Sequence, residues 1–143
     1  MRIELVIRGQ PPRKSNSREI VRNRRTGKWM VIKSKAARKW MADAIKQVPT
    51  AAKLGIGSAE HPLKVTYHVF YASRRPDLST ELIKDMLEAA GVISNDRHIY
   101  QEHAYKFFDK HHPRVHVVVE PLPDSHGFMA PVAEGLQMSF AGG

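Results

Sequence analysis

Residues 63–91 read LKVTYHVFYASRRPDLSTELIKDMLEAAG, and within this stretch the spacing of apolar residues changes once. Up to Tyr71 apolar and polar side chains alternate, which is the period of a half-buried strand. Between residues 78 and 90 the apolar side chains recur every three or four positions, and Gly91 follows where a helix commonly ends. The sequence therefore predicts a strand over 63–71 that leads through SRRP into a helix over 78–90.

The residues upstream predict two further units. Arg2–Arg8 alternates in the same way as a strand, and VRNRRTGKWMVIKS has the pattern of a basic hairpin with its turn at Thr26 and Gly27. Ser34 is a suitable N-cap for a helix that runs to Gln47, where Pro49 follows. We therefore expect a strand, a hairpin and a first helix before the central stretch.

Downstream, residues 99–108 and 114–120 are predicted to pair with each other as a closing hairpin across DKHHP. From Leu122 onward Pro, Gly, Ala and Ser dominate, which is typical of a flexible tail. A chain of 143 residues with 42% hydrophobic side chains is the usual size of one domain with a substantial core. We expect one domain over 1–121 and a flexible C-terminal tail over 122–143.

Positive charge is concentrated at one end of a chain whose formal net charge is +9. Residues 1–53 hold 15 of the 23 Lys and Arg against three acids, so nucleic acid is the expected partner. Cysteine is absent, which excludes disulfides and thiolate metal sites. No apolar run approaches the ~20 residues of a membrane-spanning helix. We expect a cytoplasmic protein that does not engage a membrane.

Carboxylates gather around the central helix of this basic chain: Asp77, Glu81, Asp85, Glu88 and Asp96. Like charges four residues apart cost a helix only about 0.2–0.5 kcal/mol per pair, so a solvated acidic face is one interpretation. The other is that carboxylates from the strand end, the helix face and the following loop converge on one point. Such oxygen ligands suit Mg²⁺, with Mn²⁺ as an alternative, so this interpretation predicts a metal-dependent nuclease site.

Histidines and tryptophans could also carry chemistry. The spacing of His98, His103, His111, His112 and His116 fits no common zinc site, so we interpret them as polar surface. Trp29 and Trp40 could stack on bases. Both lie at apolar-periodic positions, however, which favours packing in the core.

The whole pattern resembles the RusA-type Holliday-junction resolvases. The resemblance rests on RRPDLSTELIKDMLEAAGVISNDRHI, followed by Lys106 and PRVHVVVEP, and on RGQPPRKSNSR and TGKWMVIKSKAARKW upstream. It spans roughly Met1 to Pro121 and leaves the tail uncovered. It implies a small single-domain α+β fold with a mixed β-sheet and two main helices. It also implies a homodimer that cuts four-way DNA junctions with Mg²⁺ held by aspartates.

The family shows Asp-Leu-Asp-Asn at the strand end and a lysine one turn into the helix, and two registers fit this chain. In one, Asp77 is the first aspartate, Ser79 replaces the second, and Lys84 stands one place past the lysine. In the other, which is ungapped and which we prefer, Asp77 is the second aspartate and Arg75 replaces the first. Glu81 then takes the lysine position and Asp85 matches a later acid. Asn95 stands where the family often has another aspartate.

Two hypotheses follow. The first is a Mg²⁺-dependent endonuclease in which Asp77 and Asp96, with Asp85 or Glu81, hold the metal. The resemblance suggests that Lys106 contacts the scissile phosphate, and an ordinary surface lysine on a strand is the equal alternative. The second is a non-catalytic DNA- or RNA-binding module with a solvated acidic helix. Both use the same candidate DNA-binding residues, whose phosphate contacts would supply affinity: Arg13, Lys14, Arg18, Arg22, Arg24, Arg25, Lys28, Lys33, Arg74 and Arg75.

Overall fold

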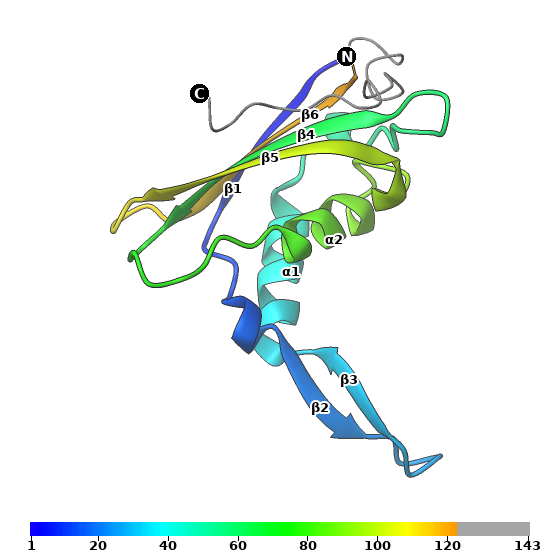
Figure 1. Ribbon diagram of the computed structural model, residues 1–143, viewed down its shortest axis with the longest axis vertical. Helices are drawn as coiled ribbons and strands as arrows, with labels where there is room; N and C mark the ends of the chain where they lie inside the picture. Colours follow the sequence, from blue (N-terminus) through cyan, green and yellow to red (C-terminus); the bar gives the residue numbers. More distant parts are fainter. Residues whose placement is uncertain (123–143) are drawn as a thin grey trace, which may run out of the picture.

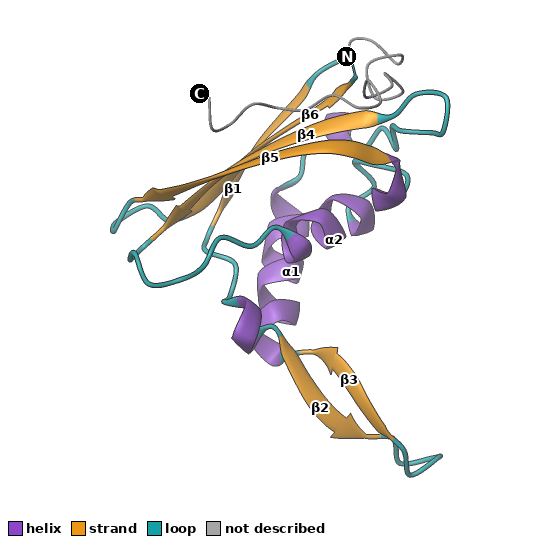
Figure 2. Cartoon of the chain, viewed as in Figure 1, coloured by secondary structure: helices purple, strands orange, loops and turns teal. Residues whose placement is uncertain are grey.

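The computed structural model describes residues 1–122, and strand β4 (Leu63–Tyr71) lies inside its main sheet (Figures 1 and 2). Every second side chain of β4 is buried, which confirms the predicted alternation. The sheet has the order β1-β6-β4-β5, in which only the β4–β5 pair is parallel. Its other strands are β1 (Ile3–Arg8), β5 (Ile99–Phe108) and β6 (Arg114–Pro121).

Two helices, α1 (Lys35–Gln47) and α2 (Glu81–Ala89), lie on one face of this sheet (Figure 1). The core forms between them and the inward side chains of the strands, so the fold is a small α+β domain as predicted. The largest side chains in it that are shielded completely from solvent come from β1, β4 and α2: Tyr67, Ile7, Leu63, Ile83, Met86 and Leu87. Trp40 of α1 is also buried, as the sequence predicts.

Helix α2 begins three residues later than its apolar pattern suggests, so Asp77 and Leu78 lie in the loop before it. Its end is as expected. Gly91 has a φ of +79°, and its N–H donates to the Glu88 carbonyl while the Val92 N–H donates to the Leu87 carbonyl. This pair of bonds is the Schellman motif, which turns the chain sharply back after the helix.

The predicted closing hairpin between residues 99–108 and 114–120 is wrong. Strand β5 pairs in parallel with β4, and β6 pairs antiparallel with the other side of β4, so β4 separates the two. The turn DKHHP therefore crosses the end of β4, where the Asp109 N–H donates to the Tyr71 carbonyl at 2.8 Å. The reason is the β4–α2–β5 crossover, in which a helix carries the chain back to start a parallel neighbour.

A two-stranded arm projects away from the sheet and helices (Figures 1 and 2). Its strands are β2 (Arg18–Arg22) and β3 (Trp29–Lys33), and Gly27 in the turn has a φ of +73°, as the hairpin prediction requires. Trp29 lies on this arm and is 70% exposed. The prediction that Trp29 packs in the core is therefore wrong, because no layer of residues 1–122 packs against the ribbon.

Ser34 joins the arm to α1. Its N–H donates to the Ser17 carbonyl at 2.9 Å, and its hydroxyl donates to the Asn16 carbonyl at 2.6 Å. The same hydroxyl accepts from the Ala37 N–H at 3.1 Å, which is the predicted N-cap. One buried side chain therefore fixes both the base of the arm and the start of the helix.

Short 3₁₀ turns complete the described chain: η1 (Lys14–Asn16), η2 (Thr50–Ala52) and η3 (Asp96–His98). Leu122 donates its N–H to the Pro62 carbonyl at 3.0 Å. The rest of the expected tail, residues 123–143, lies outside the described residues. Among residues 1–122 no helix is long and apolar enough to cross a membrane.

Candidate functional site

Tyr71, the last residue of β4, organises the loop that carries Asp77. Its buried hydroxyl donates to the Asp77 carbonyl at 3.2 Å and accepts from the Ser79 N–H at 3.3 Å. Burial raises the pKa of Tyr71, and the nearby Asp77 carboxylate adds to the rise against the opposing Ser79 hydrogen bond. A neutral phenol thus holds the backbone of Asp77 while the residue itself stays exposed.

Lys106 of β5 reaches the same end of the sheet. Its ammonium donates to the Arg74 carbonyl at 2.9 Å and lies 5.9 Å from the centre of the Tyr71 ring. The Arg74 guanidinium lies 5.4 Å from the centre of the Phe108 ring. Two cations therefore stand beside the loop of Asp77, where they can meet a phosphate.

Asp96 lies beyond the other end of α2. Its N–H donates to Glu88 Oε1 at 3.1 Å, and Asn95 caps the short turn η3 by accepting from the Arg97 N–H at 3.0 Å. Asn95 thus has a structural role at the position where the family often has an acid. Glu88, which the residue analysis placed on the acidic face but did not select, binds the backbone of Asp96.

Glu102 of β5 is a carboxylate that the sequence analysis missed. It accepts from the Tyr67 hydroxyl at 2.8 Å and forms an ion pair with Lys84 at 3.5 Å. Burial raises the pKa of Tyr67, and its hydrogen bond to Glu102 and the charges of Glu102 and Asp96 raise it further. Asp96 and Glu102 are therefore close enough to act on one phenol. The signal was the alternation of β5, which puts Glu102 on the same face as Lys106.

The two additional candidate ligands, Asp85 and Glu81, form ion pairs with lysines of the basic N-terminal region. Asp85 forms an ion pair with Lys33 at 3.5 Å, and Glu81 forms one with Lys14 at 3.9 Å. Both acids therefore face the base of the arm. Two of the candidate DNA-binding residues, Lys14 and Lys33, are consequently held beside the acidic helix.

Asp77 and Asp96 stand at opposite ends of α2, which is about 13 Å long at 1.5 Å per residue. Within residues 1–122 no three Asp, Glu or His side chains gather closely enough to hold a metal ion. The donor chemistry nevertheless fits a hard cation, because the candidates Asp77, Asp85 and Asp96 offer carboxylate oxygens. One chain therefore supplies suitable carboxylates, but Asp77 and Asp96 lie near different ends of α2.

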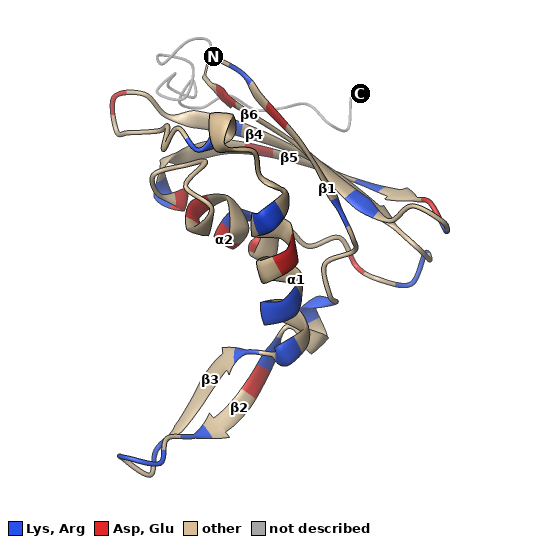
Figure 3. Cartoon of the chain, turned by 180° about the vertical axis from the view of Figure 1, so that it is seen from behind, with Lys and Arg blue, Asp and Glu red and all other residues tan. Residues whose placement is uncertain are grey.

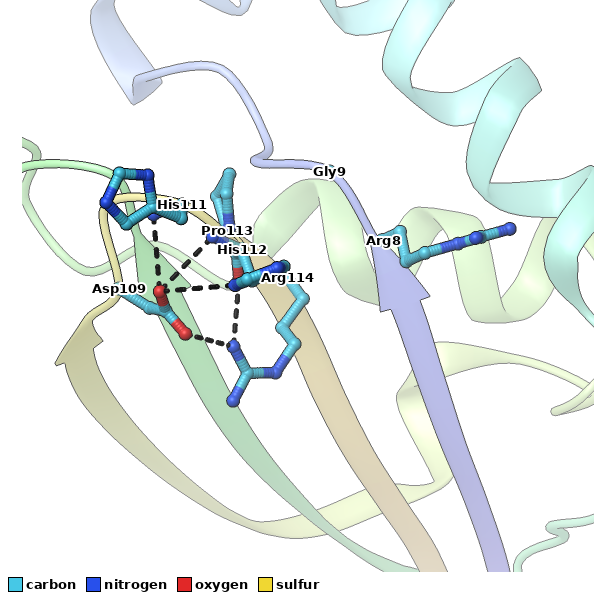
Figure 4. A pocket seen from close by; sticks show the side chains of 7 residues that line it. All are labelled: Arg8, Gly9, Asp109, His111, His112, Pro113 and Arg114. Atoms are coloured by element: carbon cyan, nitrogen blue, oxygen red, sulfur yellow. Dashed lines mark hydrogen bonds and ion pairs between the residues drawn. The ribbon is translucent and has the colours of Figure 1, made fainter.

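A pocket lies away from these residues, at the turn between β5 and β6 (Figure 4). It has a volume of about 610 Å³ and is lined by residues of that turn and the end of β1. The Arg114 guanidinium bonds Asp109 at 2.7 Å and holds the pKa of that carboxyl below its usual range. The His111 and His112 N–H groups bond the same carboxylate, so these residues stabilise a turn.

Charge is arranged around the site in two zones. Lys and Arg gather on the arm, at its tip and along α1, while acids mark α2 (Figure 3). A polyanion that contacts the arm and α1 would thus pass the acidic helix. Fold and charge together define a nucleic-acid-binding protein with a carboxylate-rich patch inside its basic surface.

A family model described as Endodeoxyribonuclease RusA matches residues 9–120. The chain therefore belongs to the RusA endodeoxyribonuclease family, and the resemblance seen in the sequence is confirmed. This is a family of DNA-binding nucleases that resolve Holliday junctions in recombination. A search of curated proteins found no match.

Proposed function

We propose that this protein is a Mg²⁺-dependent endonuclease that resolves four-way DNA junctions during recombination and repair. It works in the cytoplasm as a homodimer, and Mn²⁺ can replace Mg²⁺. The observation that carries the proposal is the family match over residues 9–120. This range includes Asp77 before α2, Asp96 after it, and Lys106 beside the Asp77 loop.

Asp77 and Asp96 are the proposed metal ligands, helped by Asp85 or Glu81. When bound, the ion would lower the pKa of a water and neutralise charge on the phosphate. Within residues 1–122 of a single chain no three possible ligands gather, so the proposal needs a way to bring Asp77 and Asp96 together. A second copy of the chain provides it.

Strand β5 is the proposed contact between the two copies. It forms one edge of the sheet, is ten residues long, and only its first residue is partly buried. Four of its aromatic side chains are more than 40% exposed: Tyr100, Tyr105, Phe107 and Phe108. A long edge strand that exposes aromatic side chains and contains no proline invites pairing with another strand. A dimer would cover it.

The two-fold symmetry of such a dimer makes the paired β5 strands antiparallel. Asp96 precedes β5, whereas Lys106 and the Asp77 loop lie near its end. Antiparallel pairing therefore brings the partner's Asp96 toward Asp77 of the first copy. Two such composite sites result, which suits a junction with two strands to cut.

The chemistry proposed at each site is hydrolysis of one phosphodiester. A water oxygen attacks phosphorus in line, the bond to the 3′ oxygen breaks, and 5′-phosphate and 3′-hydroxyl ends remain, which a ligase can rejoin. Lys106 is proposed to contact the scissile phosphate and stabilise the charge that develops on it. Arg74 and Arg75 hold the strand beside it.

The test is a cleavage assay on a synthetic four-way junction with Mg²⁺. Asp77→Asn and Asp96→Asn should bind the junction as tightly as the unaltered protein and cut it at least about a hundredfold more slowly. Glu60→Gln is the matched control, because Glu60 is an exposed acid in the loop before β4. Equal cutting by all of these proteins would remove the metal assignment.

The second candidate, a binding module without catalysis, is favoured by Ser79 standing where one register expects an acid. It predicts that the unaltered protein binds junctions tightly and cuts none with either Mg²⁺ or Mn²⁺. The same assay therefore separates the two functions.

A further inference from the structure

The arm of β2 and β3 has two unlike faces. Cross-strand partners share a face, so Arg18 and Lys33, Ile20 and Val31, and Arg22 and Trp29 form three rows on one side of the ribbon. The opposite side carries Glu19, Ile32, Val21 and Met30. The first face, called here the wedge face, therefore has apolar side chains in its middle and cations toward both ends.

The apolar side chains of the wedge face are largely exposed to solvent. Ile20 is 69% exposed, Trp29 70% and Val31 65%. An isolated two-stranded ribbon is marginal in water, and it gains nothing from leaving three large apolar side chains in contact with solvent. Such an exposed apolar strip marks a surface that meets a partner.

Charge identifies the class of partner. The arm, residues 18–33, carries six Lys and Arg and one acid. Lys33 is paired with Asp85, and among residues 1–122 the other five cations have no carboxylate within 4.0 Å. Two such arms would repel each other, whereas a polyanion would neutralise them. DNA therefore fits the arm better than a second copy of the arm does.

The position of Trp29 indicates which part of DNA it meets. It begins β3, next to the turn that carries Arg24, Arg25 and Lys28, and the Arg22 guanidinium lies 6.0 Å from the centre of its ring. Cations at the turn can hold two phosphate backbones while the ring between them lies against a base. Base faces are open only where stacking is interrupted, as at the branch of a junction.

We propose that the arm is a wedge that inserts into branched DNA, with Trp29 stacked on a base at the branch point and Ile20 and Val31 filling the opening beside it. This inference rests on the proposed function for its substrate and adds the part of the protein that distinguishes a branch from linear duplex. The basic residues of the arm supply affinity for any DNA, and Trp29 supplies the preference.

Binding measured in EDTA tests the proposal without requiring cleavage. Trp29→Ala should lower affinity for a four-way junction roughly tenfold, the loss expected for one stacked base, and should leave affinity for a linear duplex of the same sequence within about twofold. Trp29→Phe should retain most of the preference, because it keeps an aromatic face. Leu54→Ala, an exposed apolar residue outside the arm, should change neither.

Fluorescence provides a second readout. Among residues 1–122 the indole N–H of Trp40 has no hydrogen-bond partner, so Trp40→Phe breaks no hydrogen bond and leaves Trp29 as the remaining tryptophan. Its emission should be quenched by the junction and not by linear duplex. A junction that carries 2-aminopurine at the branch provides the reverse measurement. When it is mixed with the unaltered protein, the 2-aminopurine emission should also fall.

The outcomes are separable. If the unaltered protein has no preference for the junction, the proposed function fails and this inference with it. If the preference exists and Trp29→Ala keeps all of it, the inference alone is overturned. If Trp29 emission changes with protein concentration and not with DNA, the wedge face is a contact between copies, which also overturns the inference.

Discussion

The hydroxyl of Tyr71 donates a hydrogen bond to the carbonyl of Asp77 at 3.2 Å and so connects the end of β4 to the loop that carries the acid. Tyr71→Phe keeps the buried ring but leaves the Asp77 carbonyl and Ser79 N–H without this partner. We expect a loss of about 1–2 kcal/mol in the free energy of unfolding. We also expect a roughly tenfold fall in kcat on junctions, with KM little changed.

Urea unfolding and steady-state cleavage measure these two effects. Thr66→Val is the matched control, because it removes a hydroxyl from the same strand at a position on the sheet face opposite α1 and α2. A variant as active as the unaltered protein would show that Tyr71 only fills the core.

Heterodimers test whether Asp77 and Asp96 of different copies share a site. A dimer with one Asp77→Asn chain and one Asp96→Asn chain retains one composite site intact, whereas each homodimer retains none. We expect the purified heterodimer to nick a supercoiled cruciform plasmid without linearising it, while both homodimers leave it intact. If the heterodimer is also inactive, each site draws both aspartates from one chain.

Lys106→Met removes the ammonium but keeps an apolar chain over the Tyr71 ring. Because the charge is proposed to act on the scissile phosphate, we expect cutting at saturating protein to fall about a hundredfold. Junction affinity should stay within about twofold. Lys110→Met, in the turn after β5, should have neither effect. A loss of affinity with unchanged cutting at saturation would assign Lys106 to binding alone.

Asp109 makes stability depend on pH at the turn between β5 and β6. Its pKa in the folded protein is lowered from 3.8, chiefly by the hydrogen bond from Arg114. The folded state thus binds the proton less readily than the unfolded state does. The carboxylate stabilises the fold above pH 3.8 and loses this effect as pH falls through the lower folded pKa.

Thermal unfolding checks this expectation. Asp109→Asn should have a lower Tm than the unaltered protein near neutral pH, and the difference should shrink as the pH falls below 3.8. Asp43→Asn is the control, because Asp43 is an exposed acid that forms no ion pair within residues 1–122. If the difference in Tm stayed constant with pH, the contact between Arg114 and Asp109 would stabilise the turn without requiring the Asp109 charge.

Local patterns in the sequence predicted most of the elements. The alternation over residues 63–71, the N-cap at Ser34, the turn at Gly27 and the end of α2 at Gly91 were all confirmed. Each depends on residues that are neighbours in the chain. The pairing of β5 was missed because the short turn DKHHP favoured a hairpin, although the strand–helix–strand order already indicated a parallel crossover.

The site was less predictable for the same reason. Periodicity showed that Trp29 and Trp40 lie at apolar positions, but it could not show that no layer of residues 1–122 packs against the arm that carries Trp29. The sequence also indicated that acids cluster along the chain around α2. It could not indicate that the helix length separates Asp77 from Asp96, since that separation is a property of the folded chain.

Ser34 gives the arm mechanical leverage over the domain. The Ser34 hydroxyl bonds both the carbonyl of Asn16 and the first turn of α1. A force that bends the arm would therefore also rotate that helix. Strain imposed by a bent substrate would then reach the helices beneath the sheet at this residue, beside the ion pairs that join Lys14 and Lys33 to α2.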